Sequence, residues 1–249
     1  MEKRTEGFHF NGIKPGTPVD LEQLITAYPH QVISLQMIDR EEESVQIFFF
    51  DQEEGISTDI QDQDILYVVT GGTALFTVDH KESELKAGEC MLVPSGCPHS
   101  IYAYTALRLL QISVGAISAG HEKRGGFNMS GKDYIKNVDK ACVHTLSQLI
   151  GYQDNKVASL TLVQRDLFTT TIMAMDKGTG VGPHACEGDA MVIALEGEGE
   201  VMIGEELHLL KQGECIVMPA DIPHRVRGER DRFKMMLIVS KPEVSNQEK

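Results

Sequence analysis

The sequence GECIVMPADIPH at residues 213–224 repeats GECMLVPSGCPH at residues 88–99. The offset between the two stretches is 125 residues, and the same offset carries LEQLI at residues 21–25 onto LSQLI at residues 146–150. The two copies align without a gap over the roughly eighty residues from the first of these matches to the second. Agreement at one fixed offset over this distance indicates an internal duplication.

Each copy contains short β-type runs separated by Gly, Pro and acidic turns, a pattern typical of an all-β sandwich or barrel. A short helix is expected before the strands of each copy, with Asp20 or Thr17 as the cap of the first one. We therefore expect an N-terminal barrel over residues 1–114, a linker over 115–139, a C-terminal barrel over 140–241 and a polar tail over 242–249. The expected strands are 32–37, 45–50, 65–70, 74–78 and 90–93, then 160–163, 169–175, 191–195, 200–203 and 215–218.

The composition excludes several classes of protein. Hydrophobic residues make up 41% of the 249 residues, which is enough for a packed core. The net charge of −14 argues against a nucleic-acid or anionic-membrane partner. No signal-peptide or membrane-spanning pattern is present, and five scattered cysteines fit reduced thiols better than a disulfide framework. We expect a soluble cytoplasmic protein whose partner is a small molecule.

The motifs of the second copy resemble those of the cupin superfamily. GPHACEGDA at residues 182–190 and LEGEGEV at 195–201 precede the 213–224 stretch, and the 88–99 stretch repeats the second motif in the first copy. The resemblance implies two tandem cupin barrels (double-stranded β-helix, or jelly roll) with short flanking helices, a two-domain bicupin. It also implies a metal ion held by two His, one Glu and a final His. Residues two apart on a strand point the same way, so a His-x-His pair presents both rings to one cavity.

The second copy departs from this metal-binding pattern. His184, Cys186 and His224 occupy three of the four ligand positions, whereas Ala190 stands at the position of the Glu. The resemblance therefore implies a divalent transition metal (Mn, Fe, Ni or Zn) on three ligands, one of them a thiolate when metallated. Asp189 lies one residue before the Glu position, so strand alternation points it to the opposite face.

The first copy is degenerate at the same positions. They hold Asp59, Gln61, Ile65 and His99, a set poorly suited to a metal. His99 is interpreted as a structural residue that makes a hydrogen bond inside a filled barrel.

Alternate residues of the strand that contains the Glu position should point into the barrel, and these residues differ between the two copies. In the second copy they are Ala190, Val192 and Ala194, which are small and predict a ligand pocket. Residues 65, 67 and 69 of the first copy are Ile, Tyr and Val, and they would fill much more of a barrel. The second copy is therefore the candidate site.

Three functions remain open at this point. The first is a metal-dependent isomerase, lyase or oxygenase that acts on a sugar or organic acid in the C-terminal barrel, with no catalytic residue assigned. The second is a non-catalytic bicupin that binds a small molecule without a metal. The third is a purely structural bicupin. The two fused copies would mimic a cupin dimer within one monomer, or the chain would form a homodimer.

Overall fold

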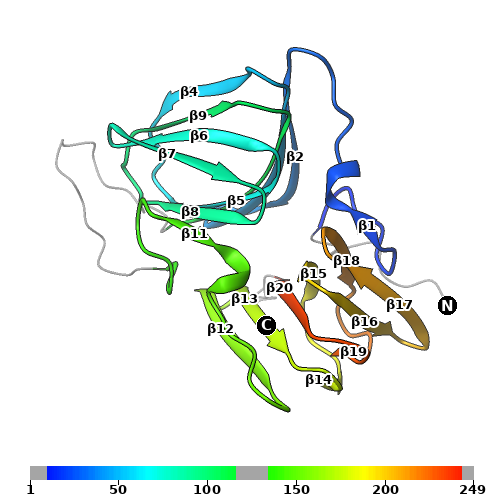
Figure 1. Cartoon of the computed structure of the whole chain (residues 1–249). Helices are drawn as coiled ribbons and strands as arrows, with labels where there is room; N and C mark the ends of the chain where they lie inside the picture. The colour runs from blue at the N-terminus through cyan, green and yellow to red at the C-terminus, as the bar shows by residue number, and fades with distance from the viewer. Residues whose placement is uncertain (1–9, 116–133, 243–249) are drawn as a thin grey trace, which may run out of the picture. The chain divides into compact units, whose positions relative to one another are not determined.

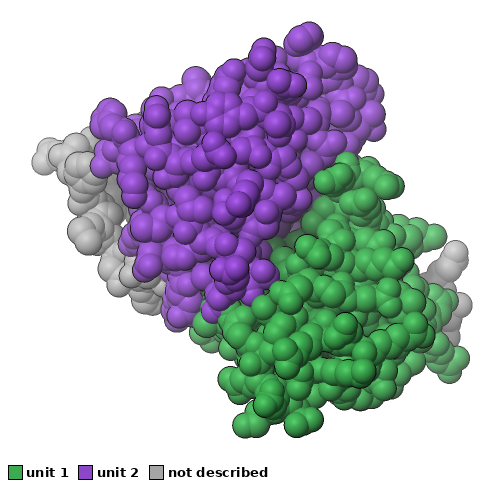
Figure 2. Space-filling view, in the orientation of Figure 1, with its two compact units in different colours: residues 1–24, 150–249 green, residues 25–149 purple. Residues whose placement is uncertain are grey.

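The computed structural model describes residues 10–115 and 134–242. Strands dominate these residues, and every pair of neighbouring strands is antiparallel. The chain divides into two compact units (Figure 2). Residues 25–149 form the unit called here the N-terminal barrel, and residues 1–24 with 150–249 form the C-terminal barrel.

The N-terminal barrel consists of two sheets (Figure 1). Six strands follow the order β11-β8-β5-β10-β3-β2, and four follow the order β4-β9-β6-β7. The strands in chain order are β2 (Val32–Asp39), β3 (Glu43–Phe50), β4 (Gly55–Asp59), β5 (Asp64–Gly71), β6 (Thr73–Val78), β7 (Lys81–Lys86), β8 (Glu89–Val93), β9 (His99–Ala103), β10 (Leu107–Val114) and β11 (Val143–Thr145).

The C-terminal barrel repeats this arrangement. Its sheets have the orders β1-β18-β15-β20-β13-β12 and β14-β19-β16-β17. The strands are β1 (Val19–Asp20), β12 (Val157–Gln164), β13 (Phe168–Met175), β14 (Thr179–His184), β15 (Asp189–Glu196), β16 (Glu198–Ile203), β17 (Glu206–Lys211), β18 (Glu214–Met218), β19 (His224–Gly228) and β20 (Phe233–Ser240). The predicted all-β class with two tandem jelly-roll barrels is confirmed.

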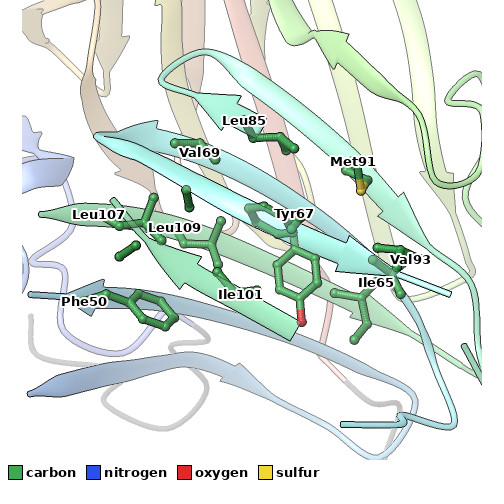
Figure 3. Close-up of a cluster of buried hydrophobic side chains, with 14 residues drawn as sticks. Phe50, Ile65, Tyr67, Val69, Leu85, Met91, Val93, Ile101, Leu107 and Leu109 are labelled. Atoms are coloured by element: carbon green, nitrogen blue, oxygen red, sulfur yellow. The ribbon is translucent and has the colours of Figure 1, made fainter. Parts of the chain in front are cut away.

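Alternating burial along the strands places the core inside each barrel. In β6 every second side chain is buried, and β13 alternates over most of its length, as expected when one sheet face covers a core. Each barrel has its own cluster of buried apolar side chains. Figure 3 shows the cluster of the N-terminal barrel, with the ring of Tyr67 among its aliphatic neighbours.

The segment that precedes each barrel in the sequence joins the sheet of the other copy. Strand β1 pairs with β18, and β11 pairs with β8. The backbone N–H of Leu21 donates to the Gly213 carbonyl at 3.1 Å, and the equivalent N–H of Leu146 donates to Gly88 at 2.9 Å. The two exchanged segments therefore obey the same offset of 125 residues as the barrels.

These segments account for the difference between the compact units and the predicted ranges 1–114 and 140–241. A repeat offset shows which segments are equivalent, but it cannot show which copy each one joins, because both copies offer the same sheet edge. Of the predicted linker 115–139, residues 116–133 lie outside the described residues, as do residues 243–249 of the predicted tail. Within the described residues, Ile135 and Val138 are buried.

The predicted short helices are single 3₁₀ turns, Leu21–Gln23 and Leu146–Gln148. Asp20 is the cap of the first, as predicted, because its side chain accepts a hydrogen bond from the Glu22 N–H at 2.9 Å. Within residues 10–115 and 134–242, no helix is long and apolar enough to cross a membrane.

Candidate functional site in the C-terminal barrel

Two histidines meet where β14 and β19 pair. His184 ends β14, His224 begins β19, and the two residues are partners in the strand register. Their rings lie edge to face, with centroids 4.6 Å apart. A register shift between Val181 and His184 lets the strand re-aim its last residue, which is a common use of a bulge near a functional site. The structure thus brings together two of the three predicted metal ligands.

Backbone carbonyls fix the protonation pattern of both rings. Nδ1 of His184 lies 2.9 Å from the Gly182 carbonyl, and Nδ1 of His224 lies 2.9 Å from the Ile222 carbonyl. A carbonyl oxygen only accepts, so each Nδ1 carries a proton and donates it. In the neutral ring Nε2 then holds a lone pair. Neither Nε2 has a hydrogen-bond partner within the described part of the chain.

Cys186 does not join this pair. Its thiol donates to the Gly188 carbonyl at 2.9 Å, and its half-buried side chain packs against the barrel core. Burial is the largest influence on the pKa of the Cys186 thiol and raises it. The Gly188 backbone opposes this shift, Asp189 and Asp221 add smaller increases, and Lys241 lowers the pKa slightly. The raised pKa favours the protonated thiol, whereas a metal ligand is a thiolate.

The remaining positions also lack the donors that a cupin metal centre requires. Ala190, at the Glu position, has no ligating atom, and its side chain is buried in the core. Asp189 points away as expected, since one carboxylate oxygen accepts a hydrogen bond from the Ala220 N–H at 2.8 Å. Among the residues that the structure describes, no three His, Cys, Asp or Glu side chains form a group that could hold a metal ion. The donor set does not fit the metal of the family.

The three residues predicted to line a ligand pocket all face the barrel interior. Ala190, Val192 and Ala194 belong to the core cluster, and each is at most 2% exposed. Methionines lie opposite the alanines in the strand register: Met218 is the partner of Ala190, and Met235 is the partner of Ala194. The barrel interior next to Ala190 and Ala194 is thus lined by flexible methionine side chains, which can repack around a bound molecule.

In the N-terminal barrel the histidine equivalent to His224 lies next to a tyrosine that occupies the barrel interior. His99, the equivalent of His224, is 4% exposed and turns Nδ1 to the Cys97 carbonyl at 3.2 Å. Its Nε2 lies 2.9 Å from the hydroxyl of Tyr67, and burial raises the pKa of that phenol, so the hydroxyl donates. The interpretation of His99 as a structural residue inside a filled barrel is confirmed.

The decisive difference between the barrels is the residue beside Nε2. The offset of 125 residues places Val192 at the position of Tyr67. Val192 cannot donate a hydrogen bond, so His224 keeps a free acceptor where His99 has a tyrosine hydroxyl. The sequence distinguishes these two residues by size, but the hydrogen bond from Tyr67 to His99 was not predicted from it. This hydrogen bond could have been predicted, because Tyr67 and His99 both occupy strand positions whose side chains are expected to point into the barrel.

Acidification is expected to destabilise the protein partly through His224. Burial lowers the pKa of His224 below its ordinary value of 6.5; the Ile222 carbonyl opposes this shift, and His184 adds to it. His224 binds a proton more readily in the unfolded chain than in the folded protein. The free energy of unfolding is therefore undiminished by His224 above its ordinary pKa, and it decreases as the pH falls from that value toward the lowered pKa of the folded protein. Urea unfolding at about pH 7.5 and about pH 5.5 should show a smaller loss in His224→Gln than in the wild type.

The control for this prediction is His80→Asn, which replaces an exposed histidine in a left-handed turn. It should lose as much stability on acidification as the wild type. A loss in His224→Gln equal to or greater than that of the wild type would contradict the lowered pKa.

The fold and the site together define a two-domain barrel protein of the bicupin class. A family model described as "Cupin domain" matches residues 51–113 and 171–240, more than half of the chain. The chain belongs to the cupin family. No match was found among curated proteins.

Solved structures share the fold over most of the chain. A "Cupin 2 conserved barrel domain protein" from Leptotrichia buccalis is 26% identical, with a TM-score of 0.76 over 92% of this chain and 98% of that one. A salicylate 1,2-dioxygenase from Pseudaminobacter salicylatoxidans is 12% identical, with a TM-score of 0.57 over 80% and 71%. AerE from Microcystis aeruginosa is 14% identical, with a TM-score of 0.52 over 92% and 98%. The last two likenesses show the fold alone.

Proposed function

We propose that the C-terminal barrel binds a small hydroxyl-bearing molecule at His184 and His224 without the aid of a metal ion. The observation that carries the proposal is the pair of equivalent histidines. His99 satisfies its Nε2 with the phenol of Tyr67, whereas His224 presents the same atom free beside Val192. A ligand hydroxyl would take the place that the tyrosine hydroxyl has in the other barrel.

The geometry favours a ligand with one polar edge and an apolar body. Nε2 of His224 accepts from a hydroxyl, and Nε2 of His184, whose ring is exposed at the barrel mouth, offers a second acceptor. Each such hydrogen bond contributes about 0.5–1.5 kcal/mol net, so specificity requires both. The methionines opposite Ala190 and Ala194 provide adaptable apolar contact for the rest of the ligand. Phenols have this character, and the hydroxyl groups of small sugars and hydroxy acids can make the same hydrogen bonds.

The proposal assigns no catalytic step. In cupins of the implied pattern, a divalent metal would polarise a carbonyl or activate water or dioxygen. Here the thiol of Cys186 is engaged with the Gly188 carbonyl, and Ala190 has no donor, so no step is derived through a metal. Binding is the function that the described side chains support.

A thermal-shift screen of sugars, hydroxy acids and phenols tests the proposal. A ligand at a concentration about 100-fold above its Kd should stabilise the protein by about 2.7 kcal/mol. The shift should be reduced in His224→Gln, which removes the imidazole acceptor, and lost in Ala190→Leu, which fills the interior. The matched control is Ile65→Leu at the equivalent position of the N-terminal barrel, which should leave the shift unchanged.

Two results would contradict the proposal. One is an unchanged ligand shift in both His224→Gln and Ala190→Leu, which would place the site elsewhere. The other is stoichiometric uptake of Mn, Fe, Ni or Zn by protein without an affinity tag, abolished by His184→Ala, which would restore the metal-dependent function.

A further inference from the structure

A hollow on the C-terminal barrel is lined by residues other than His184 and His224. It has a volume of about 380 Å³, in the range of small-molecule sites. Residues 178–183 of β14 and the turn before it form one wall, residues 155–157 at the start of β12 form another, and Arg225 and Arg227 of β19 complete it. All of these residues belong to one compact unit.

Three cations line this hollow in a chain whose net charge is −14. Arg227 is held in place by hydrogen bonding to the Gly178 carbonyl at 2.8 Å and by an ion pair with Glu229 at 3.0 Å. Within the described residues, neither the Lys156 amino group nor the Arg225 guanidinium has a hydrogen bond or an ion pair. Two cationic side chains with no ion pair among the described residues therefore line one small space.

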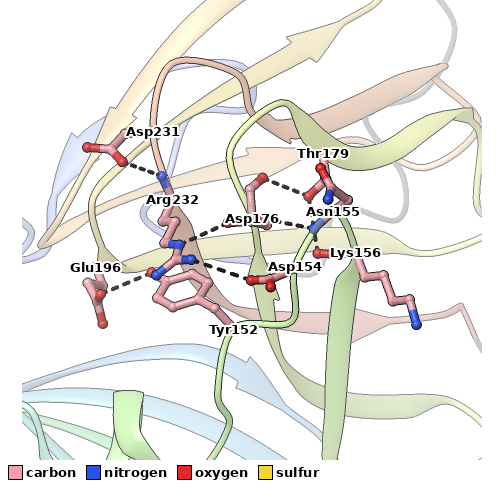
Figure 4. Close-up of polar contacts among 9 residues, drawn as sticks. All are labelled: Tyr152, Asp154, Asn155, Lys156, Asp176, Thr179, Glu196, Asp231 and Arg232. Atoms are coloured by element: carbon pink, nitrogen blue, oxygen red, sulfur yellow. Dashed lines mark hydrogen bonds and ion pairs between the residues drawn. The ribbon is translucent and has the colours of Figure 1, made fainter.

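The carboxylate of Asp176, which contacts the Asn155 backbone of the groove, is already engaged. Asp176 accepts hydrogen bonds from the Asn155 N–H at 2.8 Å and from Arg232 Nε at 2.9 Å. Figure 4 shows this network and the side chain of Lys156 extending away from it. The network leaves Lys156 available for an external anion rather than for an internal partner.

The backbone of β14 is also suited to an incoming anion. Strand β14 ends the four-stranded sheet and β12 ends the six-stranded one, so each has an edge with no neighbouring strand. Alternate N–H groups of an edge strand point away from its partner. A Cβ at Gly180 would lie 2.4 Å from Cγ of Arg227, so only glycine lets this arginine lie across the strand. A Cβ at Gly182 would meet open space, so glycine there keeps the backbone accessible.

We propose that this groove binds a small organic anion that carries at least two phosphate or carboxylate charges. Lys156 and Arg225 bind the anionic groups, Arg227 borders the site, and the exposed edge of β14 donates backbone hydrogen bonds. Arginine offers a planar fork that matches either oxyanion, and lysine adds a point charge. His184 and His224 are not among the residues that line this groove, although Pro183 and Arg225 are their neighbours in the chain.

Calorimetric titration with inorganic phosphate and with citrate, in low-salt buffer, tests this proposal. The two probes distinguish a phosphate site from a polycarboxylate site. At least one of them should bind, and the affinity should fall about tenfold or more in the double variant Lys156→Gln/Arg225→Gln, because two charge-assisted contacts are lost. Added salt should also weaken binding.

Two controls keep this test separate from the site in the barrel. Lys211→Gln, an exposed lysine of the same unit that does not line the groove, should bind the anion as the wild type does. His224→Gln should also keep anion binding, while the double variant keeps the hydroxyl ligand of the barrel. The proposal is overturned if neither probe binds the wild type, or if the double variant binds with unchanged affinity.

Discussion

Replacing Gly197 by Ala is expected to destabilise the C-terminal barrel by about 2–4 kcal/mol, since backbone strain and a steric clash act together. Gly197 joins β15 to β16 with φ +78°, a left-handed conformation that costs about 1–2 kcal/mol for a residue with a side chain. A Cβ there would also lie 2.2 Å from the carbonyl oxygen of Arg232. This neighbour is backbone, so it cannot move aside without disturbing the end of the barrel.

The matched control is Gly213→Ala. Gly213 also has a positive φ, +88°, but a Cβ there would meet nothing within 4 Å. It should cost only the conformational part, about 1–2 kcal/mol. Urea unfolding of the two variants separates the contributions. Equal costs would contradict the clash, and Gly72→Ala, with φ +81° and its Cβ 2.2 Å from the Ala106 carbonyl oxygen, should repeat the larger cost in the N-terminal barrel.

The replacement Tyr67→Val should cost about 3–5 kcal/mol, comparable to the removal of a large buried ring. Tyr67 is 3% exposed, packs its ring against Phe76 and His99, and donates its hydroxyl to His99. The variant would lose these contacts, leave a cavity and leave Nε2 of the buried His99 without a hydrogen-bond partner. It would also give the N-terminal barrel the residue that Val192 supplies in the C-terminal one.

Tyr67→Phe isolates the hydrogen bond in this prediction. It keeps the ring and removes only the hydroxyl, so it should cost about 1–3 kcal/mol. The difference between the two variants, from urea unfolding, measures how much the ring fills the barrel. If Tyr67→Val costs no more than Tyr67→Phe, the N-terminal barrel is not filled by this side chain, and the contrast between the two barrels fails.

The sequence was enough to predict the duplication and most of the central strands. The GEC…PxxxPH stretches and the fixed offset identify two equivalent barrels, because the same turns and buried positions recur in both. Four of the strands that were not predicted, β4, β7, β14 and β17, end a four-stranded sheet, and β7 buries only Leu85, so the alternation of a half-buried strand is weak there. The strands β9, β10, β19 and β20 lie inside a sheet and were also not predicted, so edge position does not explain every omission.

The candidate site was only partly predictable. The spacing correctly assigned His184 and His224 to one place, because motif positions fix which strands carry them. It could not show that Cys186 turns its thiol to the Gly188 carbonyl, since the strand has ended and side-chain alternation no longer applies. It also could not reveal the groove at Lys156 and Arg225, whose residues are 69 positions apart in the sequence and carry no motif.

In our interpretation the N-terminal barrel is filled by its own tyrosine, whereas the C-terminal barrel accepts an external molecule. A crystal structure of the protein soaked with the best hydroxyl-bearing compound of the thermal-shift screen would show which barrel holds the compound. We expect density for the compound beside Nε2 of His184 and His224, and the Tyr67 ring still in place against His99 in the N-terminal barrel. Density for the compound in the N-terminal barrel, with Tyr67 displaced and the His184–His224 pair empty, would contradict it.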